Sequence, residues 1–171
     1  MKHFRKTIAL FLVVVMLTTT MGSTVLAGTE NQGFTDLAET TVDSRFLDGI
    51  DTAGYDYVIT SQEQADELRV SDDSKSILVA CGSVYLSGIT AGTITIRNTT
   101  KIQLSNVTAK ALDISQGTAI SFTGVKADQL LIAGEKTEES SLQIDSETNI
   151  SKLELNGGQA VTLEGSGTIG D

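Results

Sequence analysis

Two carboxylates, Asp113 and Glu154, are the side chains of this 171-residue chain most suited to acid–base chemistry. Paired carboxyl groups hydrolyse glycosidic bonds when about 5 to 9.5 Å separates them across the scissile bond. Each of the two lies between inward-facing apolar residues, at an alternate position that points outward from a short strand. They can therefore act as a pair only if the strands that carry them stack on one face of the fold.

Oxygen-rich segments are the next candidates, because calcium prefers carboxylate and carbonyl oxygens. Asp72-Asp73 and Asp145-Ser146-Glu147 lack the ligand spacing of a calcium loop, and Asn156-Gly157-Gly158 lacks the aspartate of the calcium-binding nonapeptide. We interpret all three as polar turns. The sequence therefore predicts no metal site and no cofactor.

The chain contains few residues that could act as a catalytic nucleophile with a histidine base. The only histidine is His3, and the only cysteine is Cys81. Cys81 follows Ile77 and Val79 at the spacing of a strand, so we interpret it as a small core residue rather than a reactive thiol. A single cysteine also cannot form an internal disulfide. We predict no catalytic residues and expect the protein not to be an enzyme.

The N-terminus reads as a secretory signal. Lys2, Arg5 and Lys6 precede ten apolar residues at 8–17, and Val25-Leu26-Ala27 forms a small-x-small cleavage pattern. Ten apolar residues are too short to span a bilayer. We predict that residues 1–27 are a signal peptide and that the protein is secreted to the extracellular space or the cell surface. After cleavage we expect no membrane embedding. Cleavage also removes His3.

Charge excludes two classes of partner. Three of the 12 basic residues and none of the 22 acidic ones lie in the predicted signal, so residues 28–171 carry a net charge of about −13. Nucleic acids and anionic lipids both require a cationic surface. We therefore predict that neither is a partner.

An 18-residue repeat identifies the elements that carry these residues. Counted from Val84 as position 0, apolar residues recur at positions 0, 2, 5, 10 and 12, with alanine at position 7. The three copies comprise Val84, Leu86, Ile89, Ala91, Ile94 and Ile96; Ile102, Leu104, Val107, Ala109, Leu112 and Ile114; and Ile120, Phe122, Val125, Ala127, Leu130 and Ile132. A period of this length indicates a solenoid.

The spacing of the apolar positions predicts the shape of each coil. Pairs two apart face the same way along a strand, so positions 0/2, 5/7 and 10/12 predict three inward-facing edges per coil. A left-handed hexapeptide helix would need apolar residues at position 6, where Thr90, Thr108 and Lys126 stand. The sequence therefore predicts an all-β, right-handed parallel β-helix with coils of about 18 residues.

The repeat extends in both directions with variation. Leu142, Ile144, Ile150, Leu153 and Leu155 form a fourth coil, after an insertion of about four residues at 135–141. Val161, Leu163 and Ile169 begin a fifth. Leu68/Val70 and Ile77/Val79 indicate an earlier, degenerate coil.

The N-terminal part of the secreted chain differs from the coils. Apolar residues within 34–50 are consistent with a short helix or loop, and 57–59 with a strand. Ser61-Gln62-Glu63-Gln64 is a capping box that opens a short helix. We predict a lead and cap at 28–67, with some helix, and a β-solenoid at 68–171.

This geometry weighs against a sugar-cleaving pair. Position 11 is Thr95, Asp113, Leu131 and Glu154 in successive coils, so the two carboxylates lie two coils and about 10 Å apart. No basic residue shares this column. Tyr85 alone among outward residues of the regular coils is aromatic, and the Thr93/Thr95 rung that could begin an ice-binding row is not repeated.

Residues 59–68, followed by strands at 77–79 and 84–86, resemble the entry to pectate-lyase-like right-handed β-helices. Residues 150–169, with Leu153-Glu154-Leu155-Asn156 and Gly165-Ser166-Gly167-Thr168-Ile169, resemble solenoid stretches of large secreted surface proteins of Gram-positive bacteria. The resemblances cover about 110 residues, and their motifs are structural. They imply fold and location rather than activity.

The expected function is a structural or adhesive solenoid module without catalytic activity, secreted or at the cell surface. Its partner is not identified, and cell-wall glycans, host glycans and surface proteins are the candidates. The alternative is a fragment of a polysaccharide lyase or glycosidase, since those enzymes occur on this fold. No cap follows 167–171, so we expect an incomplete solenoid, or one that self-associates edge to edge.

Overall fold

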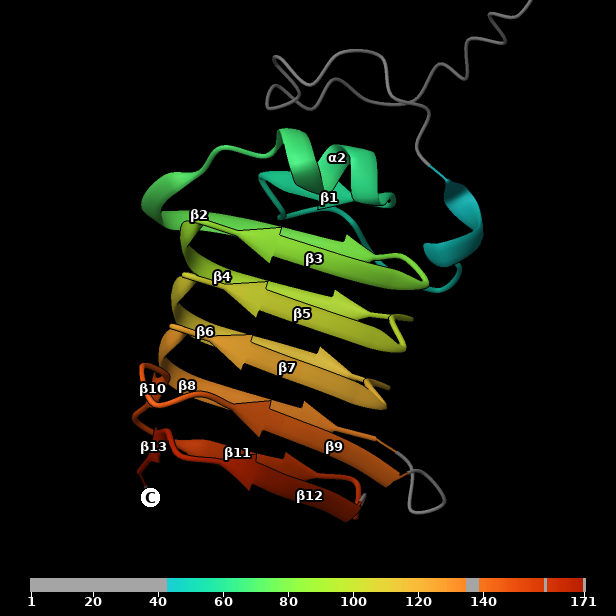
Figure 1. Cartoon of the computed structure of the whole chain (residues 1–171). Coiled ribbons are helices and arrows are strands. Elements are labelled where there is room, and N and C mark those ends of the chain that lie inside the picture. The colour runs from blue at the N-terminus through green and yellow to red at the C-terminus, as the bar shows by residue number, and fades with distance from the viewer. Residues whose placement is uncertain (1–42, 135–138, 159, 171) are drawn as a thin grey trace, which may run out of the picture. The chain divides into compact units, whose positions relative to one another are not determined.

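A computed structural model describes residues 43–134, 139–158 and 160–170 of the chain. These residues form two stacked parallel sheets that wind as a β-solenoid (Figure 1). Sheet A follows the order β1-β2-β4-β6-β8-β10-β13, with β11 also paired to β8, and sheet B follows β12-β9-β7-β5-β3. The predicted all-β solenoid is confirmed.

Each regular coil contributes one strand to each sheet. The elements are η1 Ser44–Phe46, β1 Tyr57–Ile59, α2 Gln62–Glu67, β2 Ser71–Ala80, β3 Ser83–Ser87, β4 Thr90–Arg97, β5 Lys101–Ser105, β6 Thr108–Ser115, β7 Ala119–Thr123, β8 Lys126–Ala133, β9 Glu139–Ile144, β10 Asn149–Ile150, β11 Leu153–Asn156, β12 Ala160–Gly165 and β13 Thr168–Ile169. Val84 pairs with Ile102, and Ile94 with Leu112, so the predicted 18-residue period is also the ladder register.

The second and third predicted edges are joined in one strand. In β4, β6 and β8 the chain continues through both edges, and the ladder misses only one position, at Gly92, Lys110 and Asp128. The coil therefore has two strands, of which the longer is bent. Ser151 and Lys152 separate the same two edges in coil four, where they form β10 and β11.

Inward columns build the core as the repeat predicts. Every apolar residue at positions 0, 2, 5, 7, 10 and 12 of the three regular coils is buried. Each column is covered by the coils above and below, which a single coil could not achieve. Burial of a large aliphatic side chain contributes about 1.5–3 kcal/mol, so the stack is held mainly by these columns.

The turn from sheet B to sheet A explains a motif that recurs at position 4. Gly88, Asn106 and Gly124 all have positive φ there, of 68°, 53° and 62°. Glycine and asparagine are the residues that adopt this left-handed conformation at least cost. The repeated Ser/Thr-Gly/Asn-Ile/Val triplet is therefore a turn followed by a core residue.

The cap at the first coils contains the predicted strand and helix. The Ser61 hydroxyl accepts from the Gln64 amide N at 3.3 Å and opens α2. The Gln64 side chain reaches back one residue further than a capping box requires, and its Oε1 accepts from Thr60 N at 2.6 Å. The strand β1 pairs in parallel with β2, so sheet A already begins at Tyr57.

Helix α2 also occupies the outer edge of sheet B. The Gln62 side-chain amide donates to Tyr85 O at 2.9 Å and accepts from Tyr85 N at 2.8 Å. It therefore satisfies backbone groups that a neighbouring strand would otherwise pair. Such coverage is how parallel sheets avoid open edges.

Segment 43–56 crosses the outer face of sheet A. Asp43 N donates to Thr60 Oγ1 at 2.9 Å at one end of β1, and Asp56 accepts from Ser76 N at 2.8 Å at the other. Val58 and Leu78 of β1 and β2 point outward by alternation and are nevertheless buried.

The same outer patch corrects one expectation. Thr95 pairs with Leu78 in the ladder and is only 4% exposed, so position 11 is not a solvent-exposed column throughout. Leu78, the ladder partner of Thr95, is also buried, so the outer face of sheet A is covered at the first coils in a way that periodicity does not encode.

The last two coils keep the direction of the ladder but shift its register. Ala119 pairs with Ser141, which places the predicted four-residue insertion before β9. Our alignment of Val161 with Leu142 was wrong, because Leu163 pairs with Leu142 and Gly165 with Ile144. A shift of two residues leaves the inward face unchanged, so the alternating pattern could not reveal it.

Two leucines of these coils, Leu155 and Leu163, are 54% and 50% exposed despite their inward register. Self-association through this edge stays a prediction. The predicted signal peptide at 1–27 and the lead at 28–42 lie outside the described residues. Within the described ranges, no helix has the length and apolar character needed to cross a membrane.

Candidate binding groove

The two carboxylates that could have formed a catalytic pair are each held by a cation. Asp113 lies two ladder steps from Glu154, with Leu131 between them, as predicted. Arg97 Nη2 lies 2.6 Å from Asp113 Oδ2, and its Nη1 lies 3.1 Å from Oδ1. This bidentate ion pair holds the Asp113 carboxylate in one orientation against Arg97.

Sequence reasoning missed this partner because Arg97 lies at position 13, one column away from Asp113. Glu154 is paired within its own coil, since the Lys152 ammonium donates to its carboxylate. That hydrogen bond holds the pKa of Glu154 below its ordinary value. A general acid needs a raised carboxyl pKa, so the environment of Glu154 does not favour this role.

The segments considered for calcium have local structural roles. Asp72 Oδ1 accepts from Ser74 N at 2.9 Å within a bulge of β2. Asp145 Oδ1 accepts from Gly124 N at 3.0 Å and Thr148 Oγ1 at 2.7 Å, and these bonds lower the pKa of its carboxyl. Within the residues that the structure describes, no group of three or more metal-ligating side chains occurs.

Cys81 lies in the core cluster and is 3% exposed. Burial raises the pKa of its thiol, which disfavours the reactive thiolate. Its interpretation as a small core residue is confirmed.

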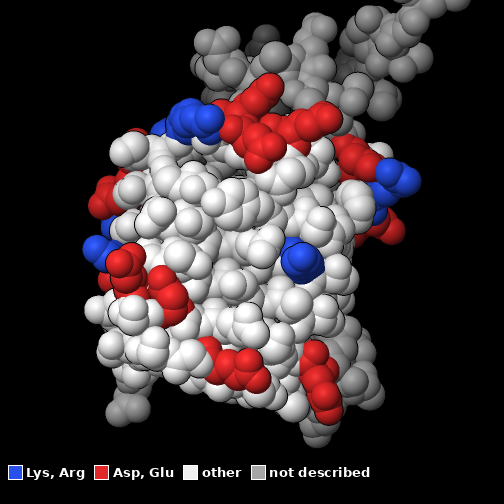
Figure 2. All heavy atoms as spheres, viewed as in Figure 1, with Lys and Arg blue, Asp and Glu red and all other residues white. Residues whose placement is uncertain are grey.

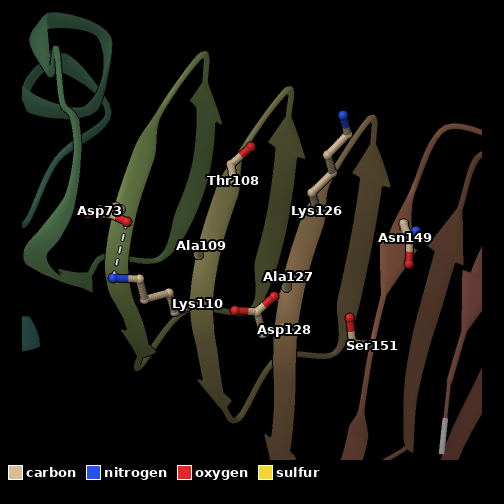
Figure 3. Close-up of a pocket in the computed structure, with 10 residues that line it drawn as sticks. Asp73, Thr108, Ala109, Lys110, Lys126, Ala127, Asp128, Asn149 and Ser151 are labelled. Carbon is tan, nitrogen blue, oxygen red and sulfur yellow. Dashed lines mark ion pairs between the residues drawn. The ribbon is translucent and has the colours of Figure 1, made fainter.

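A groove follows the bend of sheet A, where the coil turns between its two joined edges (Figure 3). Its volume is about 340 Å³, and its lining comes from successive strands of the sheet. The lining residues are Asp73, Ala91, Thr108, Ala109, Lys110, Lys126, Ala127, Asp128, Asn149 and Ser151. Alternation and the one-residue interruption of the ladder thus turn outward side chains of β2, β6, β8 and β10 onto one concave surface, while β4 contributes the buried Ala91 to its floor.

A β-bulge forms one end of this groove. Asp72 pairs with Ala91 but Ser76 pairs with Thr93, so β2 carries two extra residues. Gly92 permits the close approach, because a Cβ there would lie 2.6 Å from Asp73 O. Bulges re-aim side chains, and here the Asp73 carboxylate lies 3.1 Å from Lys110 Nζ, two strands away.

The remaining charges of the groove are free to meet a ligand. Lys126 and Asp128 are exposed and, among the described residues, neither takes part in an ion pair within 4 Å. Lys126 and Thr108 also border a second hollow of about 400 Å³, which Asn106, Gly124 and Glu147 complete. We assigned no role to these residues from the sequence, although position 6 is polar in all three regular coils and position 8 in two of them.

The outer face of sheet B is different in character. Its strands present mainly serine, threonine and glutamine, and Figure 2 shows largely uncharged atoms across this face. Tyr85 is 45% exposed there, as predicted, and hydrogen bonds with Ser87 and Ser105 lower the pKa of its phenol. The hollows on this face are lined by serine, threonine and glutamine together with apolar residues, and their charged lining residues are Lys101, Asp145 and Glu164.

Comparison with known proteins adds no assignment. No protein-family model, curated protein or solved structure matches the chain, so its functional interpretation rests on the solenoid and its surfaces.

Proposed function

We propose that this chain is a non-catalytic structural and adhesive module of a secreted or cell-surface bacterial protein. The predicted signal peptide and the resemblance to surface solenoids support the location. The observation that carries the proposal is the groove along the bend of sheet A, where polar side chains from successive coils share one concave surface. A rigid stack that repeats such side chains offers many weak contacts to an extended partner.

The ion pairs of the outer column support the absence of catalysis. Asp113 and Glu154 are neutralised by Arg97 and Lys152, and Leu131 separates them. Hydrolysis of a glycosidic bond needs one protonated and one ionised carboxyl group. The groove, moreover, lies on the other side of the bend from this column.

The alternative is a carbohydrate-active fragment. One observation favours it, namely that Asp113 and Glu154 face outward on the same sheet two strands apart. At about 4.8 Å per strand, their backbones are about 10 Å apart, near the spacing of an inverting pair.

Two assays on the purified chain separate these functions. We expect it to co-sediment with cell walls or host cells and to release no reducing or unsaturated sugars from a polysaccharide panel. Sugar release that Asp113→Asn abolishes would overturn the proposal in favour of the enzyme. Failure to bind any wall or cell surface would contradict the adhesive role.

A further inference from the structure

Resting on the proposed adhesive function, we propose that the groove at the bend of sheet A binds a linear, uncharged polysaccharide laid along the solenoid axis. The proposal assigns a site and a ligand class. It follows from the charge order of the lining, the path of the groove and the size of its floor residues.

The lining carries two cations and two anions in mixed order. Lys110 and Lys126 donate hydrogen bonds, whereas Asp73 and Asp128 accept them. A polyanion would be repelled by the carboxylates and a polycation by the ammonium groups. Sugar hydroxyls both donate and accept, so a neutral polyol can satisfy Lys126 and Asp128 together without breaking the ion pair between Asp73 and Lys110.

The path of the groove favours a polymer over a small molecule. Its lining begins at the β2 bulge and continues through β6 and β8 to Asn149 and Ser151 of the fourth coil (Figure 3). Neighbouring strands lie about 4.8 Å apart, so polar groups recur along the axis at roughly the length of one sugar unit.

The floor allows the ligand to approach the backbone closely. Ala91, Ala109 and Ala127 stand at position 7 of three successive coils, between positions 6 and 8, which are polar apart from Gly92. Their small side chains are buried, so the side chains that stand up from the floor are the polar ones. Lys110 and Asp128 rise from neighbouring strands at the bend, where the ladder is interrupted.

The hydrogen-bonding side chains of the groove also predict how affinity depends on the length of the polysaccharide. Each hydrogen bond to a sugar replaces one to water, so a single contact contributes little. No aromatic side chain lines the groove among the described residues to supply stacking. Binding should therefore strengthen with the number of sugar units until the chain spans the groove.

Affinity electrophoresis of the purified chain tests the proposal. Native gels would contain dextran, mannan, xyloglucan or a soluble β-1,3-glucan as neutral probes, and polygalacturonate as the anionic probe. We expect retardation by at least one neutral polymer, and roughly tenfold weaker binding for Lys126→Ala or Asp128→Ala. Lys101→Ala on sheet B is the matched control, because it removes the same charge from an exposed strand position.

The outcomes separate this inference from the proposed function. Loss of retardation in Lys126→Ala but not in Lys101→Ala supports the groove. No retardation by any neutral polymer, stronger retardation by polygalacturonate, or equal binding by both variants overturns it. Co-sedimentation with cell walls that persists in Lys126→Ala and Asp128→Ala leaves the adhesive role standing and removes only the groove.

Discussion

The bend of sheet A and the face of sheet B are built from the same coils but present different surfaces. Sheet B strands of the regular coils are five residues long, straight and almost uncharged on their outer side. The β4, β6 and β8 strands are eight residues long and bent, and the bend gathers lysine and aspartate into a groove. Both faces share the same inward pattern, so they differ in the residues at their outward positions and in the interrupted ladder position at the bend.

The comparison shows that inward and outward positions of the repeat carry different information. The apolar period fixes which positions point inward, and it is satisfied equally on both faces. Outward positions are constrained only by strand chemistry, so they can be neutral on one face and charged on the other. A function carried by outward residues is therefore compatible with a strictly repeated core.

A substitution that disrupts the shared core should unfold both sheets together. Leu112→Asp places an unpaired charge in a fully packed column, and we expect it to destabilise the fold by about 4 kcal/mol or more. Asp113→Ser at the adjacent outward position should cost about 1 kcal/mol or less, because its pair with Arg97 is partly exposed. Thermal unfolding followed by circular dichroism would show the contrast, and similar small effects would contradict the inward and outward assignment.

The groove should be damaged separately by a change at its bulge. A Cβ at Gly92 would lie 2.6 Å from Asp73 O, so Gly92→Ala should displace the bulge and cost about 1–3 kcal/mol. Gly82→Ala is the control, since its Cβ would meet only the Phe46 ring at 3.8 Å. Urea unfolding of both variants is the measurement. Equal stability would show that the bulge is not rigidly placed.

Substitutions in the turn that joins the two sheets should change stability only through the backbone conformation that the new residue can adopt. Gly88 has φ of 68° and open space around its Cβ position, so Gly88→Ala should cost about 1 kcal/mol. Asn106→Gly, at the equivalent turn, should be close to neutral because glycine accepts the same φ. If urea unfolding finds Gly88→Ala harmless, the left-handed turn is not what the repeated triplet encodes.

The stability of the fold should depend slightly on pH through the carboxyl group of Asp56. Hydrogen bonds from the Ser76 backbone, Lys75 and the Ser76 hydroxyl lower the pKa of Asp56 from 3.8 to about 2. Its ionised form therefore stabilises the fold above about pH 4, and this contribution is lost as the pH falls through 2. Urea unfolding of the parent chain and Asp56→Asn should converge between pH 4 and pH 2. A difference that stays constant would contradict the anchoring role of Asp56.

Much of the fold follows from apolar spacing. The period, the inward columns, the β1 strand, the α2 helix and the insertion before β9 were all predictable, because burial imposes strict alternation on a strand. The continuous bent strand was not, since an apolar pattern does not distinguish a bend from a corner. The register of β12 was not either, because a shift of two residues preserves the pattern.

The candidate site was less accessible from the sequence. Recognition of the groove requires the concavity at Lys110 and Asp128, and the bulge that brings Asp73 to Lys110 has no signature in the repeat. The burial of Thr95, at an outward position, likewise has no signature in the repeat. These features depend on departures from the regular coil, whereas the period describes only the regular coil.

Protection of engineered cysteines would test most directly whether the groove, and not the sheet B face, is the binding surface. Cys81 is buried and should react slowly, so Ser151→Cys in the groove and Thr123→Cys on sheet B can each be labelled selectively with a maleimide. With the neutral polysaccharide that retards the chain most strongly, we predict slower labelling at Ser151→Cys and an unchanged rate at Thr123→Cys. Protection at Thr123→Cys alone, or at neither position, would contradict the account.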